Sequence, residues 1–142
     1  MTPTPDRIRW ERLKANYKKW REQGAWIEAG LWFGFDVTHS WTVGTERLLM
    51  ALVTEPEWCQ DMFNHFLDVG IALLEQVWDA GYTFDGVTWP DDMGYKRRQF
   101  FSLSTYRELL SRCTSAPSTG RTRRASRRGC TRAATSTRSS RS

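Results

Sequence analysis

Hydrophobic residues recur at the three- and four-residue spacing of amphipathic helices in several parts of this chain. The spacing predicts a charged helix over residues 7–23, ended by Gly24, and a shorter helix over residues 42–53. Aromatic residues carry much of the apolar face of the first helix, at Trp10, Tyr17 and Trp20. Both segments are expected to pack one face against a core.

The strongest helical pattern begins at Thr54-Glu55-Pro56-Glu57. This motif is a capping box, Ser/Thr-x-x-Glu, with proline in the first turn, where its missing N–H has no hydrogen-bond partner to lose. Gly81 is the predicted stop. The predicted buried face consists of Trp58, Met62, Phe66, Val69, Leu73, Val77 and Ala80.

Two segments have the composition of buried strands. Residues 26–37 are apolar and aromatic with glycine interruptions, and residues 84–89 form a short apolar run stopped by Pro90. A loop over residues 90–101 then leads to a helix that Ser104 is expected to cap.

The predicted order is strand, helix, helix, strand, loop, helix. Strands that alternate with helices indicate a parallel sheet with helices outside, and therefore the α/β class. Two strands do not close a sheet, and a (β/α)₈ barrel typically takes about 250 residues. We therefore expect the central portion of a barrel and not a complete one.

Charge divides the chain into unlike parts. Up to Leu110 there are 12 Lys and Arg against 16 Asp and Glu, whereas residues 111–142 contain nine Arg, no Lys and no acid. The tail also lacks every large apolar residue, so burial cannot offset its chain entropy and we expect it to be disordered. The predicted organisation is an N-terminal charged helix (1–25), a barrel segment (26–110) and this tail.

The cysteines and the N-terminal sequence indicate a cytoplasmic protein. Cys59, Cys113 and Cys130 have no metal-binding spacing, and Cys59 falls in a predicted helix as a buried free thiol. The sequence begins without an apolar signal core, and no segment reaches the ~18 apolar residues of a membrane span. We expect neither secretion nor membrane insertion.

Acidic residues follow the second predicted strand. In parallel α/β folds, ligands bind beyond the carboxyl ends of strands, which here are Phe35–His39 and Trp89–Tyr95. Asp91 and Asp92 are the candidate catalytic pair, since carboxylates at a strand end can bind N–H groups or transfer protons once burial shifts them. The alternative is a turn or helix cap with solvated acids.

Two further sets of side chains have competing interpretations. His39 can carry protons or bind a ligand in the same pocket, or it can be an ordinary loop hydrogen-bonding residue. The run Lys96-Arg97-Arg98 can bind carboxylate or phosphate, or it can be a solvated face of the loop.

The segments LWFGFDVTHSW, LLMALVTEPEWCQDMF, AGYTFDGVTWPDDMGY and FFSLSTYRELL, taken together, resemble the uroporphyrinogen decarboxylase superfamily. That superfamily also contains corrinoid methyltransferases. The resemblance covers roughly residues 26–110 and implies a (β/α)₈ barrel with its site in the strand-end cleft. The parent reaction it implies is decarboxylation of a tetrapyrrole without a cofactor, or zinc-dependent methyl transfer involving a corrinoid.

The resemblance also implies a set of site residues. Asp91 and Asp92 match the family's pocket-lining turn, and decarboxylases usually carry a small hydroxyl residue and an aromatic residue where this chain has Asp92 and Met93. This departure favours the methyltransferase-like branch. Phe35 to Thr38 match a second strand end that faces the substrate. With the residues next to the two strand ends included, the candidate substrate-binding residues are Phe35, Asp36, Thr38, His39, Met93, Gly94 and Tyr95.

The tail has an explanation in the genetic code. If one base was lost after Leu110, the codons from Ser111 become compatible with K-P-V-H-K-R and, further on, H-S-C-G-D, which resembles the family's continuation. The zinc-ligating His-x-Cys pair of the methyltransferase branch is then missing from this chain, and Cys113 and Cys130 do not replace it. We expect a chain that is inactive as it stands.

Two other classes of protein compete with this interpretation. Nine arginines in the tail would bind nucleic-acid phosphates without sequence specificity and with a steep salt dependence. Residues 7–110 would instead be a small interaction protein if they formed a stable fold on their own. The leading expectation is a small-molecule partner, either a tetrapyrrole or a methyl donor, with neither membrane nor specific nucleic-acid binding.

Overall fold

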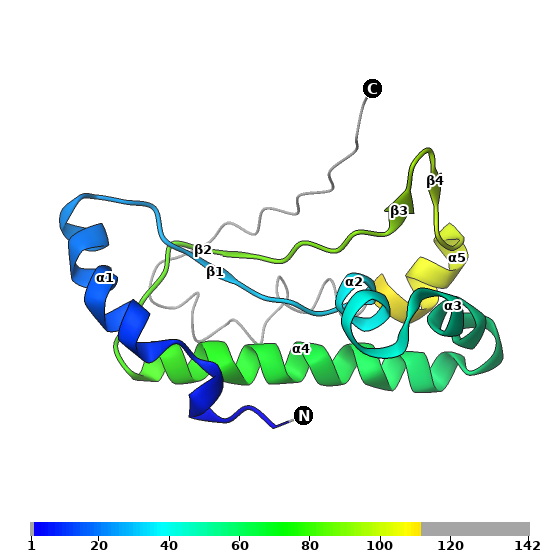
Figure 1. Cartoon of the computed structure of the whole chain (residues 1–142), viewed down its shortest axis with the longest axis horizontal. Coiled ribbons are helices and arrows are strands. Elements are labelled where there is room, and N and C mark those ends of the chain that lie inside the picture. Colours follow the sequence, from blue (N-terminus) through cyan, green and yellow to red (C-terminus); the bar gives the residue numbers. More distant parts are fainter. Residues whose placement is uncertain (1, 112–142) are drawn as a thin grey trace.

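A computed structural model describes residues 2–111 of the protein. Its longest element is α4 (Pro56–Asp79), above which the strands β1 (Glu28–Gly30) and β2 (Gly86–Thr88) run (Figure 1). Helix α1 (Trp10–Glu22) lies at one end of α4, and α3 (Thr45–Thr54) lies at the other. The predicted disordered tail lies outside the described residues, except for Ser111, which continues the last helical turn.

The predicted N-terminal helix is present as α1, preceded by the short 3₁₀ turn η1 (Pro5–Arg7). Arg21 near its end ties it to the strands. The Arg21 Nη1 atom donates to both Asp85 carboxylate oxygens, at 2.9 and 2.7 Å, and Nη2 donates to the Thr83 carbonyl at 2.7 Å. Asp85 also accepts the Ile27 N–H at 2.9 Å, so one ion pair joins α1, the start of β1 and the approach to β2.

The two strands pair in parallel, as the element order predicted. Glu28 lies opposite Gly86, and Gly30 lies opposite Thr88. Helix α4 approaches this layer closely, since a Cβ added at Gly70 would lie 2.9 Å from the Leu31 Cδ2 atom. The glycine therefore lets the chain leaving β1 pack directly on the helix.

The predicted strand over residues 26–37 is wrong beyond Gly30. Residues 35–43 instead form one helical segment, α2 (Phe35–Val37) continued by the π-helical turns η2 (Thr38–Val43). Gly34 precedes it with φ of 89° and ψ of −152°, a conformation essentially restricted to glycine. The apolar composition of this segment fits a buried helix as well as a buried strand, and only the contacts distinguish the two.

Helices α3 and α4 confirm the two predicted central helices but correct their junction. Thr54 does not cap α4, because its hydroxyl donates back to the Met50 carbonyl at 3.2 Å and Glu55 occupies the cap position. Pro56 does stand in the first turn of α4. The junction is therefore set by proline and not by a capping box.

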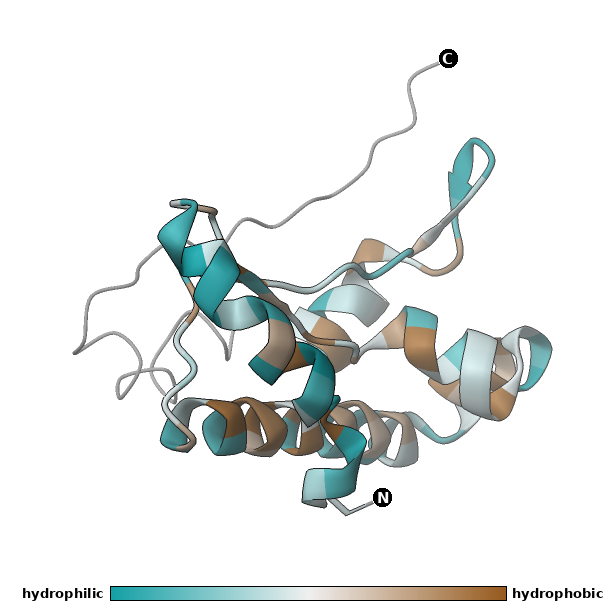
Figure 2. Ribbon diagram, turned by 60° about the vertical axis from the view of Figure 1, so that its left-hand side comes forward, coloured by the Kyte–Doolittle hydropathy of each residue, from teal (hydrophilic) through white to brown (hydrophobic). Residues whose placement is uncertain are grey.

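Over the first half of α4 the buried face lies one position later than predicted, whereas Val69 is buried as predicted. Cys59, Phe63 and Leu67 are buried together with Val69, while Trp58 is 40% exposed. Met62 and Phe66 are only partly buried at the margin of the core. The helix is apolar around much of its circumference, so its neighbours decide which side is covered (Figure 2).

After β2, the predicted loop contains a small hairpin. β3 (Gly94–Tyr95) pairs in antiparallel fashion with β4 (Arg98–Gln99). The last helical segment is α5 (Leu103–Thr105) followed by the π-helical turn η3 (Tyr106–Leu110). Ser102, and not Ser104 as expected, caps it by accepting the Thr105 N–H at 3.1 Å.

The core lies where α3, α4 and η3 meet the residues that follow the two strands. Figure 2 shows apolar residues along α3 and α4, whereas α1 is largely hydrophilic. The buried cluster consists of Leu31, Phe33, Phe35, Leu48, Ala51, Leu52, Cys59, Phe63, Leu67, Trp89, Leu109 and Leu110.

The expected partial (β/α)₈ barrel is wrong. In the part of the chain that the structure describes, the parallel sheet is one pair of three-residue strands, the second sheet is the small hairpin, and helices form most of the rest. The segment expected to extend the first strand toward a barrel wall turns into a helix after Gly34. A single short strand pair cannot curve into a barrel wall.

The observed register of α4 makes a prediction about its core. Replacing Phe63, which is fully buried, with alanine is expected to lower the free energy of unfolding by about 3–5 kcal/mol. Replacing Trp58 with alanine is expected to lower it by about half as much or less, because part of that side chain is already in water. Chemical denaturation of both variants measures the difference, and a larger loss for Trp58→Ala would support the face predicted from the sequence instead.

Candidate functional site

Asp91 follows β2 and caps the helical segment 35–43 from a distance in sequence. The Phe35 N–H donates to its Oδ2 atom at 3.2 Å, and the Asp36 N–H donates to its Oδ1 atom at 2.7 Å. The first N–H groups of a helix have no partner within the helix, and a carboxylate there also meets the positive end of the helix dipole. Asp91 therefore holds the end of β2 against the start of α2.

Gly34 makes this contact possible. A Cβ added at this position would lie 2.3 Å from the Asp91 Oδ2 atom, well inside van der Waals contact, and its φ of 89° independently disfavours any side chain. The sequence FGFD thus places the one residue without a side chain where the carboxylate must approach.

Burial raises the pKa of Asp91 to about 6 from its ordinary value of 3.8. The two backbone N–H groups of Asp36 and Phe35 oppose this shift, since they stabilise the ionised form, and the nearby carboxylates of Asp36 and Asp92 add to it. A carboxyl group with such a pKa exchanges its proton close to neutral pH, which is the property expected of a general acid or base.

Asp36 and His39 form a second polar cluster on the same helical segment. The Asp36 Oδ1 atom accepts the Ser40 hydroxyl at 3.0 Å and lies 3.4 Å from His39 Nε2. The other ring nitrogen of His39 lies 3.0 Å from the Thr45 hydroxyl oxygen. The imidazole therefore links the Asp36 carboxylate in α2 to the Thr45 hydroxyl at the start of α3.

Aromatic rings enclose the His39 side chain. Its ring centroid lies 4.6 Å from that of Phe35 and 5.5 Å from that of Phe100. Phe101 packs on Phe35 as well, with the centroids of these two rings 4.8 Å apart. Polar partners and aromatic neighbours together fix the imidazole in one orientation.

Asp91 and Asp92 have separate surroundings although they are adjacent in sequence. Asp92 is exposed, and its Oδ1 atom accepts the Gly94 N–H at 3.1 Å, which begins the turn into the hairpin. The alternative interpretation, a turn or helix cap, thus describes contacts of both residues: Asp92 forms a turn in solvent, and Asp91 caps the start of α2. Asp91 is also the partly buried carboxyl group with the raised pKa, and its catalytic role stays a prediction.

The remaining predicted site residues separate into two groups. Phe35 and Thr38 are buried in the protein interior, where the Thr38 hydroxyl donates to the Gly34 carbonyl at 2.7 Å. Met93 is partly buried against the core, whereas Gly94 and Tyr95 are exposed in β3. The structure thus brings together Asp36, His39 and Asp91, while Thr38 supports the helix.

The sequence interpretation missed four residues of this site: Gly34, Ser40, Thr45 and Phe100. The signal for Ser40 was present, because Asp36, His39 and Ser40 have the three- and four-residue spacing of one helical face. Assigning residues 26–37 to a strand concealed it. Gly34 and Phe100 act through residues far along the chain, which no local pattern reveals.

A groove of about 550 Å³ borders this cluster at the start of α3. Thr45, the hydroxyl partner of His39, contributes to its lining. The groove is lined by Val43, Gly44, Thr45, Glu46, Arg47, Met50, Ala51, Thr54 and Glu55.

Cys59 is not a reactive group. It is a free thiol and fully buried, as predicted, and burial raises its pKa to about 11, with the charge of Glu55 adding to the effect. The thiolate that a nucleophile or metal ligand needs is therefore scarce at neutral pH.

Among residues 2–111, no three His, Cys, Asp or Glu side chains are grouped to hold a metal ion. The basic tail, for which nucleic-acid binding was a competing interpretation, and the other two cysteines fall outside this range.

Comparison with protein families, with curated proteins and with solved structures found no match to this chain.

Helix α4 has the length of a membrane span but carries five acidic residues, and none of the helices within residues 2–111 is apolar enough to cross a bilayer.

The Gly34 contact can be tested with a matched glycine. Gly34→Ala and Gly44→Ala place a side chain at nearly equal φ, 89° and 92°, but only the first meets Asp91, since the second has no atom within 4 Å. Backbone strain is expected to lower the free energy of unfolding by about 1–3 kcal/mol in both variants. The decrease is expected to be larger for Gly34→Ala, because the added methyl group also displaces the Asp91 carboxylate. Equal decreases in the free energy of unfolding, measured by denaturant titration, would show that the Asp91 side chain can move aside without destabilising the fold.

The pKa of Asp91 predicts the sign of a pH effect on stability. Because the folded-state pKa of about 6 exceeds the ordinary 3.8, the folded protein binds more protons between these values, and stability falls as pH rises through this window. The decrease is about 3 kcal/mol, from 2.2 pKa units at about 1.4 kcal/mol each. Denaturant titrations of the wild type and of Asp91→Asn from pH 4 to 7 isolate this effect. A difference in the free energy of unfolding between the two proteins that does not change with pH would contradict the prediction.

Proposed function

We propose that this chain is a fragment of a protein of the uroporphyrinogen decarboxylase superfamily. Asp91 then supplies the acid–base and N–H-binding group of a site for a tetrapyrrole-type substrate. The observation that carries the proposal is the partly buried Asp91 carboxyl, whose pKa is raised to about 6 and which lies three residues after a strand that pairs in parallel with its neighbour. The sequence resemblance over residues 26–110 supports it independently.

The chemistry of decarboxylation matches such a group. When the bond between a carbon atom and its carboxylate breaks, the carbon retains the electron pair and must receive a proton. A carboxyl with a pKa of about 6 holds that proton in part of the population at neutral pH and can deliver it. Its ionised form offers about four lone-pair positions. The Phe35 and Asp36 N–H groups use two, which leaves room for pyrrole N–H groups.

Asp36 and His39 are the proposed supporting groups. Asp36 lies at the same helix start, and its charge contributes to the raised pKa of Asp91. His39 is held between Asp36 and Thr45 and supplies ring nitrogens as hydrogen-bonding groups on the same helical segment. We expect substrate binding without turnover, because one strand pair supplies only part of a pocket wall.

Zinc-dependent methyl transfer involving a corrinoid is the other parent reaction. The residues that the structure describes contain no donor set that fits zinc, and Cys59 is buried and protonated at neutral pH. The decarboxylase-type site at Asp91 therefore fits the described residues better than a zinc site does.

The proposal can be tested by titrating the full chain with uroporphyrin, a stable tetrapyrrole, at pH 7 and following the quenching of tryptophan fluorescence. Asp91→Asn is expected to weaken binding about tenfold, because it removes a charged acceptor for N–H groups. The matched control is Asp79→Asn, which removes an equal charge at the exposed end of α4 and is expected to leave binding within about twofold.

Two safeguards keep this test decisive. Circular dichroism establishes whether Asp91→Asn retains its helices. If it does not, Asp36→Asn serves as the second variant, since the Asp36 side chain accepts the Ser40 hydroxyl and lies beside His39. Equal affinities of the wild type and both site variants would exclude the proposed role of these carboxylates.

A further inference from the structure

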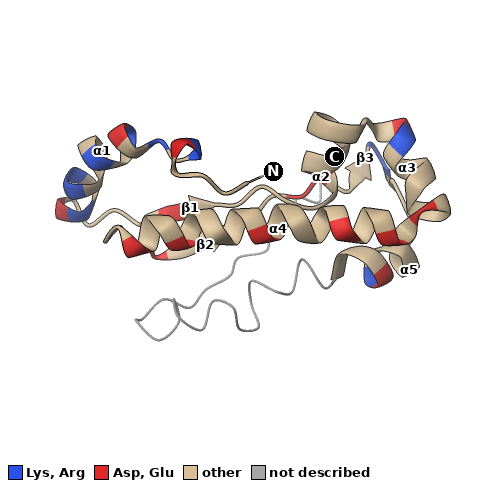
Figure 3. Ribbon diagram, turned by 90° about the horizontal axis from the view of Figure 1, so that it is seen from below, with Lys and Arg blue, Asp and Glu red and all other residues tan. Residues whose placement is uncertain are grey.

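Positive charge in the described part of the chain is concentrated at its two ends. From Glu22 through Tyr95, both included, the sequence contains 13 acidic residues and a single Lys or Arg, Arg47. The acids lie along α4 and the strands, whereas Lys and Arg gather on α1 and near the hairpin (Figure 3). Lys96, Arg97 and Arg98 are thus a local cationic group, separated from the cations of α1 by the acidic stretch of the chain.

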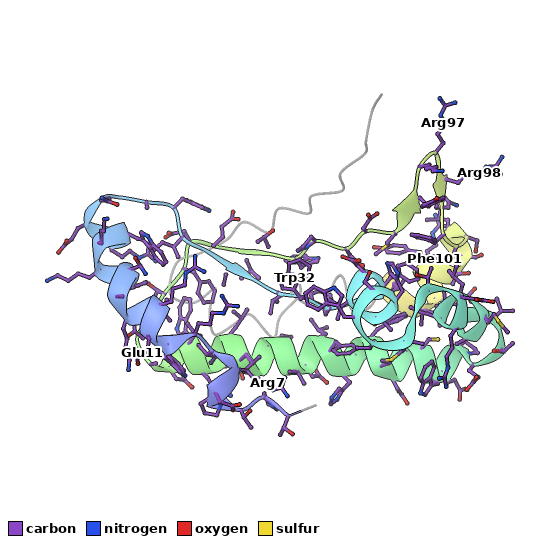
Figure 4. The ribbon with its side chains drawn as sticks, viewed as in Figure 1. Arg7, Glu11, Trp32, Arg97, Arg98 and Phe101 are labelled. Carbon is purple, nitrogen blue, oxygen red and sulfur yellow. The ribbon has the colours of Figure 1, made fainter. Side chains whose placement is uncertain are left out.

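The hairpin presents these three cations at its tip, and we call residues 94–99 the basic hairpin. Tyr95 pairs with Arg98, so Lys96 and Arg97 form a two-residue turn. All three cations are exposed, and Arg97 and Arg98 project away from the body of the protein (Figure 4). Lys96 has a φ of 52°, a left-handed conformation that lysine adopts at an energetic disadvantage.

The base of the basic hairpin is fixed to the core. The Phe100 N–H donates to the Met93 carbonyl at 3.1 Å, which closes the hairpin beyond its last strand pair. The ring of Phe100 lies 5.3 Å from that of Phe35, the residue whose N–H Asp91 accepts. The cations are therefore carried on an anchored support, which distinguishes them from charges on a mobile loop.

The three cations lack acidic partners within residues 2–111. The ion pairs there involve Lys14, Lys18, Arg21 and His39, and the contact that Lys96 makes is with a ring, its Nζ atom lying 5.1 Å from the Tyr95 centroid. Three adjacent like charges repel one another, and an oxyanion placed among them relieves this repulsion. Guanidinium groups also match carboxylate and phosphate geometry with paired hydrogen bonds.

We propose that the basic hairpin is a binding site for oxyanions of small molecules, with Arg97 and Arg98 as the binding forks and Lys96 as an additional positive charge. The ligand class is a compound carrying two or more carboxylate or phosphate groups. This inference does not rest on the proposed decarboxylase-type site, because it requires no residue of the Asp91 cluster to contact the ligand.

The test is calorimetric titration of the full chain at low ionic strength, with citrate in one arm and pyrophosphate in the other. Arg97→Gln/Arg98→Gln is expected to weaken binding about tenfold or more. The control is Arg123→Gln/Arg124→Gln, which removes the same charge from an adjacent arginine pair in the tail. It is expected to change affinity by less than about threefold. The two arms show which oxyanion is preferred.

The outcomes separate a built site from attraction by net charge. Equal weakening by the hairpin and tail variants, or no weakening by the hairpin variant, would overturn the proposal. Arg97→Lys/Arg98→Lys keeps the charge and removes the forks, so a loss of affinity in this variant supports paired hydrogen bonding at the site. A loss of uroporphyrin binding in Asp91→Asn with citrate binding intact would show that the two proposals stand or fail separately.

Discussion

The structure depends on the contact between the Asp91 carboxylate and the first N–H groups of the 35–43 segment. This contact joins the end of β2 to the helix that follows β1, so it fixes how the chain continues beyond both strands. It requires that residue 34 have no side chain and that a carboxyl group be partly buried. Phe35, held at this junction, then packs against Phe100 and Phe101 and positions the last helical turns.

The same contact sets two demands on Asp91 that oppose each other. A helix cap functions best as an ionised acceptor, whereas burial and two neighbouring carboxylates favour the protonated form. The resulting pKa of about 6 means that a change of pH near neutrality alters both the strength of the cap and the availability of the proton. Structural anchoring and acid–base chemistry are therefore compatible properties of this carboxyl and not competing explanations of it.

The other end of the molecule uses an ion pair in place of a buried acid. Arg21 and Asp85 remain partly exposed, and the pKa of Asp85 is lowered, first by the Ile27 N–H and then by Arg21. The two Asp residues thus show opposite shifts: a backbone N–H and a cationic partner stabilise the ionised form of Asp85, whereas desolvation, with two nearby carboxylates adding to it, disfavours the ionised form of Asp91. Helix α4 spans the distance between these two junctions (Figure 1).

The sequence by itself determined the elements whose pattern is local. Periodicity and stop residues located α1, α3, α4 and β2, and composition identified Cys59 as a buried thiol, because these depend on side chains within a few turns of one another. Only the tertiary structure decided that residues 35–43 are helical, since their cap comes from Asp91, more than 50 residues later. Several faces of α4 are apolar, and packing against its neighbours determines which of them is buried. In place of the expected barrel segment, the described residues form one short parallel strand pair packed on a long helix. Such choices depend on contacts between distant parts of the chain, which spacing along the sequence does not encode.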